Sequence, residues 1–157
     1  MAAHRNPALR WLLRAPVHLY HWRIGWLLGR RFLLLIHMGR RSGKRHETVL
    51  EVMEYREAAA EAVVMSGFVR NADWLRNIQA APACEVVIGS RRFAAAYRLL
   101  GADEAVCVVA GYERRHRLTR PLIRAVLSYL VGWRYRGRCS DRRRLVSQLP
   151  LVSFAPR

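Results

Sequence analysis

Residues 39–44, with the sequence GRRSGK, have the composition of an anion-binding loop. They lie between two apolar runs that we expect to be strands. The glycines allow a positive φ that turns backbone amides towards one concavity, and the cationic and hydroxyl side chains add donors. The segment is not a P-loop, because the spacing to Lys44 is one residue short, Arg45 replaces the required Ser or Thr, and a strand should follow. On residue types alone, it is either a phosphate cradle or an ordinary basic turn.

Other residues that carry chemistry are not grouped as a catalytic or metal site requires. His18, His21 and His37 lack the spacing of metal ligands. Glu51 and Glu54 are three positions apart on a predicted strand, which places them on opposite faces. The sequence therefore predicts neither a hydrolase nor a metal site.

The three cysteines, Cys84, Cys107 and Cys139, are far apart and odd in number. This pattern encodes neither a disulfide framework nor a zinc site. A reducing compartment fits best, and we expect all three to be buried as small apolar side chains.

Length and composition favour one folded domain over residues 1–157. A hydrophobic fraction of 52% with 25% charged residues is typical of globular chains. The formal net charge of +17 attracts phosphates and anionic lipid. However, 27 of the 28 basic residues are arginines, which points to a GC-rich genome and weakens the charge as evidence for nucleic-acid binding.

The segment 1–31 is predicted to form two short amphipathic helices, which begin near Pro7 and Pro16. Arginines interrupt its apolar residues, so a membrane-spanning helix is not expected. It also lacks the small-residue cleavage site of a signal peptide. Tryptophans beside arginines suit an interfacial helix, so residues 6–31 either contact a membrane surface or cap the rest of the fold.

The remaining pattern predicts mostly antiparallel strands with inserted helices. Residue 71 should cap a helix that ends at residues 81–82. Along the second strand, Val49, Met53 and Tyr55 should share one face, and Leu50 and Val52 the other. The order favours an α+β half-barrel over a doubly wound sheet. Strands are expected at 32–38, 48–55, 61–66, 84–88, 91–99 and 151–154, and the later helices at 103–117, 119–130 and 140–148.

Several segments, in the same order along the chain, resemble the deazaflavin-dependent nitroreductase and quinone reductase family. The likeness extends over about residues 7–156, and no single motif decides it. The segments are the GRRSGK loop, Thr48–Val52, Met65–Gly67, Asp73–Asn77 with Ala81–Pro82, Val86–Phe93, Tyr112–His116 and Leu149–Phe154.

This resemblance implies a split β-barrel that binds coenzyme F420, with its phosphate and acidic tail on the basic loop. FMN is the alternative cofactor, because it also carries a phosphate and a flat tricycle. Two departures touch the expected pocket: residues 67–70 lack the Gly-Gly and Pro common in the family, and His46 stands where Arg is frequent. The implied contacts are Arg40, Arg41 and Ser42 to the phosphate with Lys44 nearby, His46, Thr48, Val49 and Leu50 along the next strand, Met65, Ser66 and Gly67 at the deazaflavin, and Trp74 and Asn77 from the helix.

Hydride transfer from a reduced deazaflavin needs orientation, exclusion of water and a proton donor. Tyr112 and His116 are candidate catalytic residues, because both could face the pocket from a helix. Alternatively, they are a partly exposed aromatic residue and a solvated histidine.

The leading hypothesis is an F420-dependent oxidoreductase that reduces a quinone, a nitro compound or a similar hydrophobic acceptor. We expect it in the cytoplasm, with residues 6–31 as a peripheral contact on the inner face of the membrane. The alternatives are an FMN-binding split-barrel flavoprotein and a non-enzymatic basic module for anionic lipid or nucleic acid. Nucleic acid is disfavoured because the aromatic residues cluster in apolar segments, and the oligomeric state stays open.

Overall fold

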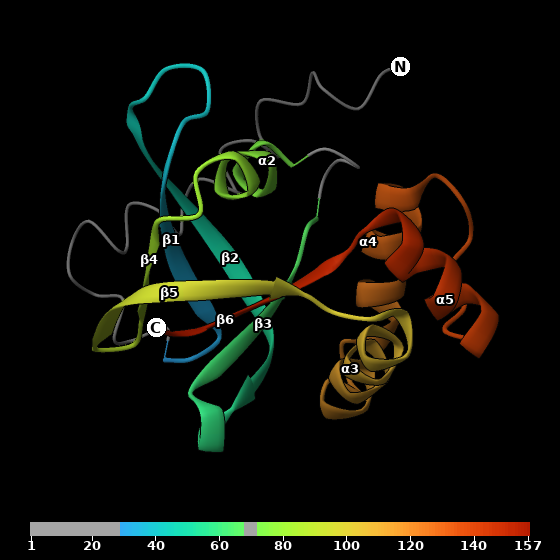
Figure 1. The fold of residues 1–157 in the computed structure, drawn as a ribbon. Helices are drawn as coiled ribbons and strands as arrows, with labels where there is room; N and C mark the ends of the chain where they lie inside the picture. Colours follow the sequence, from blue (N-terminus) through green and yellow to red (C-terminus); the bar gives the residue numbers. More distant parts are fainter. Residues whose placement is uncertain (1–28, 68–71) are drawn as a thin grey trace.

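The computed structural model describes residues 29–67 and 72–157, and its centre is a closed six-stranded barrel. All neighbouring strands are antiparallel, in the order β1-β2-β3-β6-β5-β4. This confirms the predicted α+β barrel, which Figure 1 shows with its helices. The strands are β1 Phe32–Met38, β2 Arg45–Arg56, β3 Glu61–Met65, β4 Cys84–Ile88, β5 Arg91–Leu99 and β6 Leu151–Pro156.

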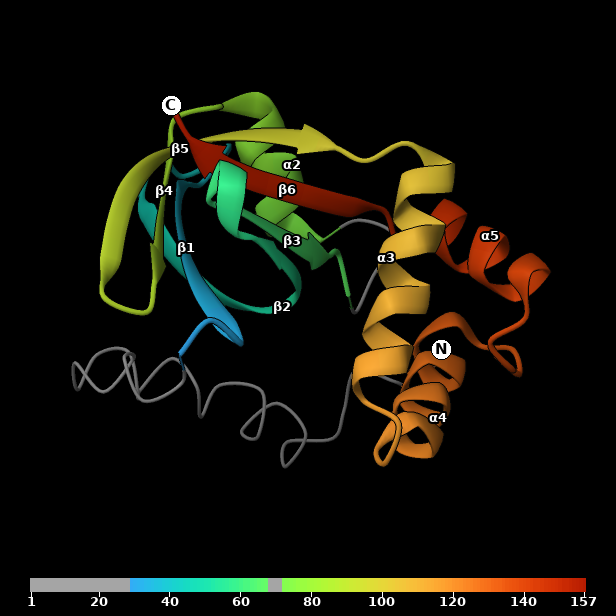
Figure 2. The ribbon, with the colours of Figure 1, turned by 90° about the horizontal axis from the view of Figure 1, so that it is seen from below.

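The helices occupy two separate places around the barrel. Figures 1 and 2 show α3, α4 and α5 grouped on one side, whereas α2 lies apart from them and contacts β1. The elements are α2 Asp73–Ala80, α3 Ala102–Arg115, α4 Arg120–Val131, α5 Cys139–Gln148 and the 3-10 turn η2 Glu57–Ala59. None of the helices in the described ranges has the length and apolar character needed to cross a bilayer.

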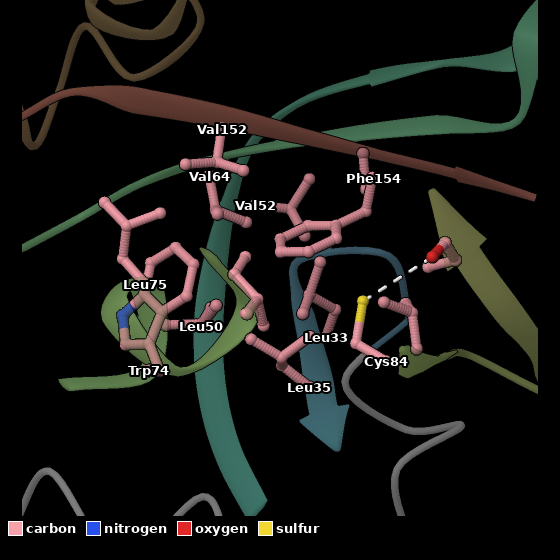
Figure 3. Packing of buried hydrophobic residues seen from close by; sticks show 14 of the residues in the cluster. Leu33, Leu35, Leu50, Val52, Val64, Trp74, Leu75, Cys84, Val152 and Phe154 are labelled. Atoms are coloured by element: carbon pink, nitrogen blue, oxygen red, sulfur yellow. Dashed lines mark hydrogen bonds between the residues drawn. The ribbon is translucent and has the colours of Figure 1, made fainter. Parts of the chain in front are cut away.

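Two apolar cores hold the barrel and the helices together. The first fills the barrel, where Trp74 of α2 packs against Phe154 of β6 with ring centroids 6.2 Å apart. Figure 3 shows this cluster, together with the bond from the Cys84 thiol to the Ala95 carbonyl. The second core lies between the outside of the barrel and α3–α5, and includes Val63 and Leu145. Each core removes its side chains from water, which stabilises the fold.

A β-bulge in β2 changes the predicted faces of that strand. Val52 pairs with Val64, but Glu54 pairs with Val63, so Met53 is an extra residue. Tyr55 consequently packs against the barrel interior and not on the face of Met53, which joins the outer core. The same shift puts Glu54 on the outer face with Glu51, so the predicted opposite placement of these carboxylates was wrong.

Most element boundaries match the prediction. The bounds of β1, β4 and β5 are those expected, whereas β2 begins three residues earlier because polar residues 45–47 pair with residues 36–38. The expected burial of all three cysteines was wrong. Cys84 is buried, but Cys107 and Cys139 are exposed, since they lie on the solvent side of α3 and at the first turn of α5. The predicted helices before residue 29 and the cap at residue 71 lie outside the described residues.

Candidate cofactor site

A cavity of about 480 Å³ opens where the β1–β2 loop meets α2. The end of β1, the loop, the start of β2 and one face of α2 form its walls. It gathers seven of the residues predicted to bind a cofactor: Arg40, Arg41, Ser42, His46, Thr48, Trp74 and Asn77. His37, Gly39, Glu47 and Asp73 complete the lining.

A chain of hydrogen bonds joins the walls of this cavity. The Asn77 Oδ1 atom accepts bonds from Arg40 N at 3.2 Å and Arg40 Nη1 at 2.9 Å. The Asn77 amide nitrogen lies 3.3 Å from His37 Nδ1, and His37 Nε2 lies 3.2 Å from Thr48 Oγ1. Because an amide nitrogen donates, His37 Nδ1 accepts and its Nε2 carries the proton. The chain therefore fixes α2 against β1 and β2.

The electrostatic surroundings of His37 agree with that neutral form. Burial lowers the pKa of His37, and the nearby His46 lowers it further. The two imidazole rings are stacked, with centroids 5.8 Å apart. A neutral His37 therefore serves as a hydrogen-bonded spacer between Asn77 and Thr48.

Gly39 allows the loop to close tightly. Its N–H donates to the Lys44 carbonyl at 2.8 Å, and its carbonyl accepts from Gly43 N at 2.8 Å. A Cβ atom at Gly39 would lie 2.5 Å from Ser42 Oγ and 2.6 Å from His46 Nε2. Any side chain there would therefore force the Ser42 and His46 side chains to shift.

The cations around the loop differ in how far they are neutralised. The Arg40 guanidinium contacts Asp73 Oδ1 at 3.0 Å. Arg41 and Lys44 are exposed, and neither has an acidic partner within residues 29–67 and 72–157. Two positive side chains are thus available to an anion from solvent, beside a third that is held in place.

The two candidate catalytic residues lie outside this cavity, where α3 packs on the outer face of β2. The Tyr112 hydroxyl donates to Glu51 Oε1 at 2.6 Å, and the Tyr112 and His116 rings are 4.5 Å apart. Burial raises the pKa of Tyr112, and the bond to Glu51 raises it further. Tyr112 therefore keeps its proton at neutral pH.

The model of the F420H2-dependent quinone reductase family matches residues 14–120. The chain belongs to this family. It is accordingly an F420-dependent oxidoreductase, and coenzyme F420 is its cofactor. The resemblance seen in the sequence is thereby confirmed at the level of the family. No match was found among curated proteins.

Solved structures related to this F420H2-dependent quinone reductase family member are distant in sequence. An F420-H2 dependent reductase, FDR-A, is 16% identical over 80% of this chain and 95% of that one, with a TM-score of 0.45. A protein of unknown function from Agrobacterium tumefaciens is 15% identical over 89% of this chain and 54% of its own, with a TM-score of 0.51. The heme storage protein HutZ from Vibrio cholerae is 11% identical over 88% and 90%, with a TM-score of 0.50. The latter two show likeness in fold alone.

The donors of the cavity fit the phosphate of the family's cofactor. Arg41 supplies charge, Ser42 a hydroxyl and His46 an imidazole to the cavity wall, and Lys44 adds a second cation in the same loop. Such cationic donors bind phosphate oxygens strongly, and arginine can do so with two parallel bonds. Within the described residues, no group of three or more His, Cys, Asp or Glu side chains is arranged to hold a metal.

Five other residues predicted to touch the cofactor do not line the cavity. Leu50 is buried in the barrel core, and Met65 packs against the outer core. Ser66 is almost fully buried, and its N–H donates to the Pro150 carbonyl at 2.9 Å. Val49 is half-buried on β2, and Gly67 follows β3. Lys44, a sixth predicted residue, is an exposed residue of the loop and does not line the cavity either.

Sequence reasoning missed His37 and Asp73. His37 is two and four residues beyond Leu35 and Leu33, which both face the barrel interior, so strand alternation could have placed it at the cavity floor. Asp73 begins α2, where an acidic side chain is ordinarily explained by the helix dipole. Its additional role as the partner of Arg40 depends on a contact between distant segments, which left no signal in the sequence.

Proposed function

We propose that this protein transfers a hydride from reduced F420 to a quinone or a similar hydrophobic, electron-poor acceptor at the inner surface of the cytoplasmic membrane. The observation that carries the cofactor placement is that Arg41 and Lys44, in the loop that borders the cavity, have no acidic partner in the part of the chain that the structure describes. Reduced F420 supplies the hydride when bound. The protein would bind the phosphorylated end of the cofactor and exclude water from the reacting ring.

The cavity residues would act mainly by orientation. Arg40 is already fixed by Asp73 and Asn77, so little side-chain freedom is lost when an anion binds. Arg41 and Lys44 would add charge, and Ser42 and His46 would add hydrogen bonds. The β2 strand runs from this cavity to the contact between Glu51 and Tyr112, which connects the phosphate end to the candidate proton donors.

Tyr112 and His116 stay predicted proton donors for the reduced acceptor. What supports the role of Tyr112 is geometry, because its hydroxyl is fixed by the 2.6 Å bond to Glu51. Glu51 would orient the hydroxyl. A nitro compound is the other acceptor of the same chemical type, and turnover with each class separates the two.

The test is equilibrium binding of F420 and FMN to the purified full-length protein. We expect F420 to bind more tightly than FMN does. Arg41→Ala with Lys44→Ala should weaken F420 binding by about one hundredfold or more, since each charged hydrogen bond contributes about 1.5–3 kcal/mol. Arg91→Ala is the matched control, because Arg91 is an exposed arginine at the start of β5, outside the cavity lining. The proposal would be contradicted if FMN bound more tightly than F420, or if the Arg41→Ala, Lys44→Ala variant bound F420 as tightly as the Arg91→Ala control.

A further inference from the structure

Helix α4 carries an apolar stripe that faces solvent. Leu122, Val126 and Tyr129 recur every three or four residues and so share one face, and Leu118 precedes them in the turn before the helix. Their exposed fractions are 66%, 45% and 60%, with 98% for Leu118. Another face of the same helix supplies the buried Leu127 to the outer core. One apolar face of α4 is therefore used for packing, and a second lacks a partner among the described residues.

The surroundings of this stripe are strongly basic. Residues 114–138 contain eight arginines and neither Asp nor Glu. On the neighbouring flank of α4 is a cavity of about 440 Å³, which Arg120, Arg124, Arg134, Arg136, Pro121, Ala125, Ser128 and Tyr135 line. Arg120 and Arg134 have no acidic partner within the described ranges. The cavity can thus accept a negatively charged group.

Hydrogen bonds to Glu113 and within α4 fix the walls of this second cavity. Arg124 Nε donates to Glu113 Oε1 at 2.9 Å, and the buried Tyr135 hydroxyl donates to Glu113 Oε2 at 3.3 Å. The Ser128 hydroxyl donates to the Arg124 carbonyl at 2.6 Å and accepts from Tyr135 N at 2.9 Å. These contacts join α4 to the segment after it, so the cavity is shaped before any ligand arrives.

The combination of stripe and charge selects one kind of partner. A second copy of this chain would bring its own arginines against these, and like charges repel. An anionic bilayer offers both an apolar layer for the stripe and phosphates for the arginines, which is how basic amphipathic helices bind membranes. Figures 1 and 2 show α4 on the opposite side of the molecule from the β4–β5 hairpin.

We propose that α4 docks on an anionic lipid surface, with its stripe in the region between headgroups and acyl chains and the arginine-lined cavity on a lipid phosphate. This inference rests on the proposed function, since it assigns a surface to the membrane location given there. Helix α4 would thus be a second membrane contact, in addition to the one predicted for residues 6–31. Hydrophobic acceptors dissolved in the bilayer would then reach the enzyme from this side.

The test is co-sedimentation of the full-length protein with vesicles of phosphatidylcholine alone or mixed with phosphatidylglycerol. We expect binding to the anionic vesicles only, weakened by salt. Leu122→Gln with Val126→Gln should reduce it by about tenfold or more, because two partly inserted apolar side chains are lost. Leu99→Gln, at an exposed leucine of β5, is the matched control and should bind as the unaltered protein does.

The cavity is tested separately from the stripe. Arg120→Gln with Arg134→Gln should lower affinity for the anionic vesicles by about thirtyfold, because each charge near the surface contributes about 1 kcal/mol. Arg91→Gln should leave it unchanged. Unchanged vesicle binding in the α4 variants, with loss on deleting residues 1–28, would overturn the proposal. A dimer in solution that the stripe variants dissociate, or an acidic protein that competes with vesicles, would also overturn it.

Failure of this inference is distinguishable from failure of the proposed function. The α4 variants should keep the affinity for F420 and the oxidation of F420H2 by a water-soluble quinone, because α4 does not line the cofactor cavity. If the unaltered protein did not bind F420, that result would instead count against the proposed function itself.

Discussion

The two basic cavities of this protein are built in different ways. At the β1–β2 loop, a chain of hydrogen bonds through the neutral His37 and Asn77 fixes Arg40. Arg41 and Lys44 have no acidic partner among the residues that the structure describes. At α4, a buried carboxylate holds Arg124 from behind, and an exposed apolar stripe lies alongside. A fixed polar frame suits one ligand of defined shape, whereas arginines beside an apolar stripe suit a surface. Positive charge alone therefore does not indicate what a site binds.

Removing the carboxylate behind the α4 cavity should have the largest effect on stability. Glu113 is 2% exposed and pairs with Arg124 and with Arg142 at 2.6 Å. Glu113→Ala leaves two cations without their partner, and breaking a buried pair costs about 3–5 kcal/mol. The free energy of unfolding from urea denaturation measures this.

The control for Glu113→Ala is Glu104→Ala. Glu104 also contacts two arginines, Arg56 and Arg98, but that cluster lies at the surface. Exposed ion pairs contribute about 0–1 kcal/mol, so the loss should be much smaller. Equal losses in the two variants would show that burial is not what gives Glu113 its importance.

Breaking the neutral chain at the other cavity should have an intermediate effect. Asn77→Leu removes the acceptor of Arg40 N and the donor to His37, and each buried group left unpaired costs about 1–3 kcal/mol. F420 affinity should also fall, because Arg40 loses its anchor, while binding to anionic vesicles should not change. Asn77→Asp retains the acceptor for Arg40 and should preserve more of the F420 affinity. Isothermal titration and vesicle co-sedimentation separate these outcomes.

The smallest expected effect is on how the free energy of unfolding changes with pH, and it should differ between the two cavities. The pKa of His37 is lowered on folding, so its contribution is present above the usual value of 6.5 and is lost as the pH falls below it. Arg124 and Arg142 lower the pKa of Glu113, although burial opposes them, so its contribution is lost only below about its usual 4.5.

As the pH falls from 6.5 to 5, protonation of His37 at the β1–β2 cavity should therefore lower the free energy of unfolding. One group can contribute at most about 1.4 kcal/mol per pH unit. His37→Gln should flatten this slope in urea denaturation, whereas Glu113→Gln should not. A slope that His37→Gln leaves unchanged would assign the decline to other groups.

Much of the barrel was predictable because local pattern and tertiary structure agree there. The hairpin of β4 and β5 combines short apolar runs with Gly89 at positive φ, and its bounds follow from the sequence. The bulge at Met53 was not predictable, because residues 49–55 alternate as an unbroken strand would. The extra residue is set by pairing with β3, which sequence alone does not reveal.

The site was predictable as far as the loop and the helix that contributes Trp74 and Asn77. The family resemblance predicts that both segments contact the cofactor, and residues of both line the cavity. Asp73 was missed because its partner, Arg40, is thirty-three positions away in the sequence. His37 was missed although the alternation of β1 puts it on the same face as Leu33 and Leu35. Val49, Leu50, Met65, Ser66 and Gly67 lie away from the cavity, and their contacts with the cofactor stay predictions.

The bulge in β2 also determines where this chain tolerates a change of length. If Met53 were deleted, Val52, Glu54 and Tyr55 would alternate regularly and keep their present faces, whereas a deletion at Val52 would not preserve that arrangement. Relatives that are one residue shorter in this strand should therefore align with the gap at Met53.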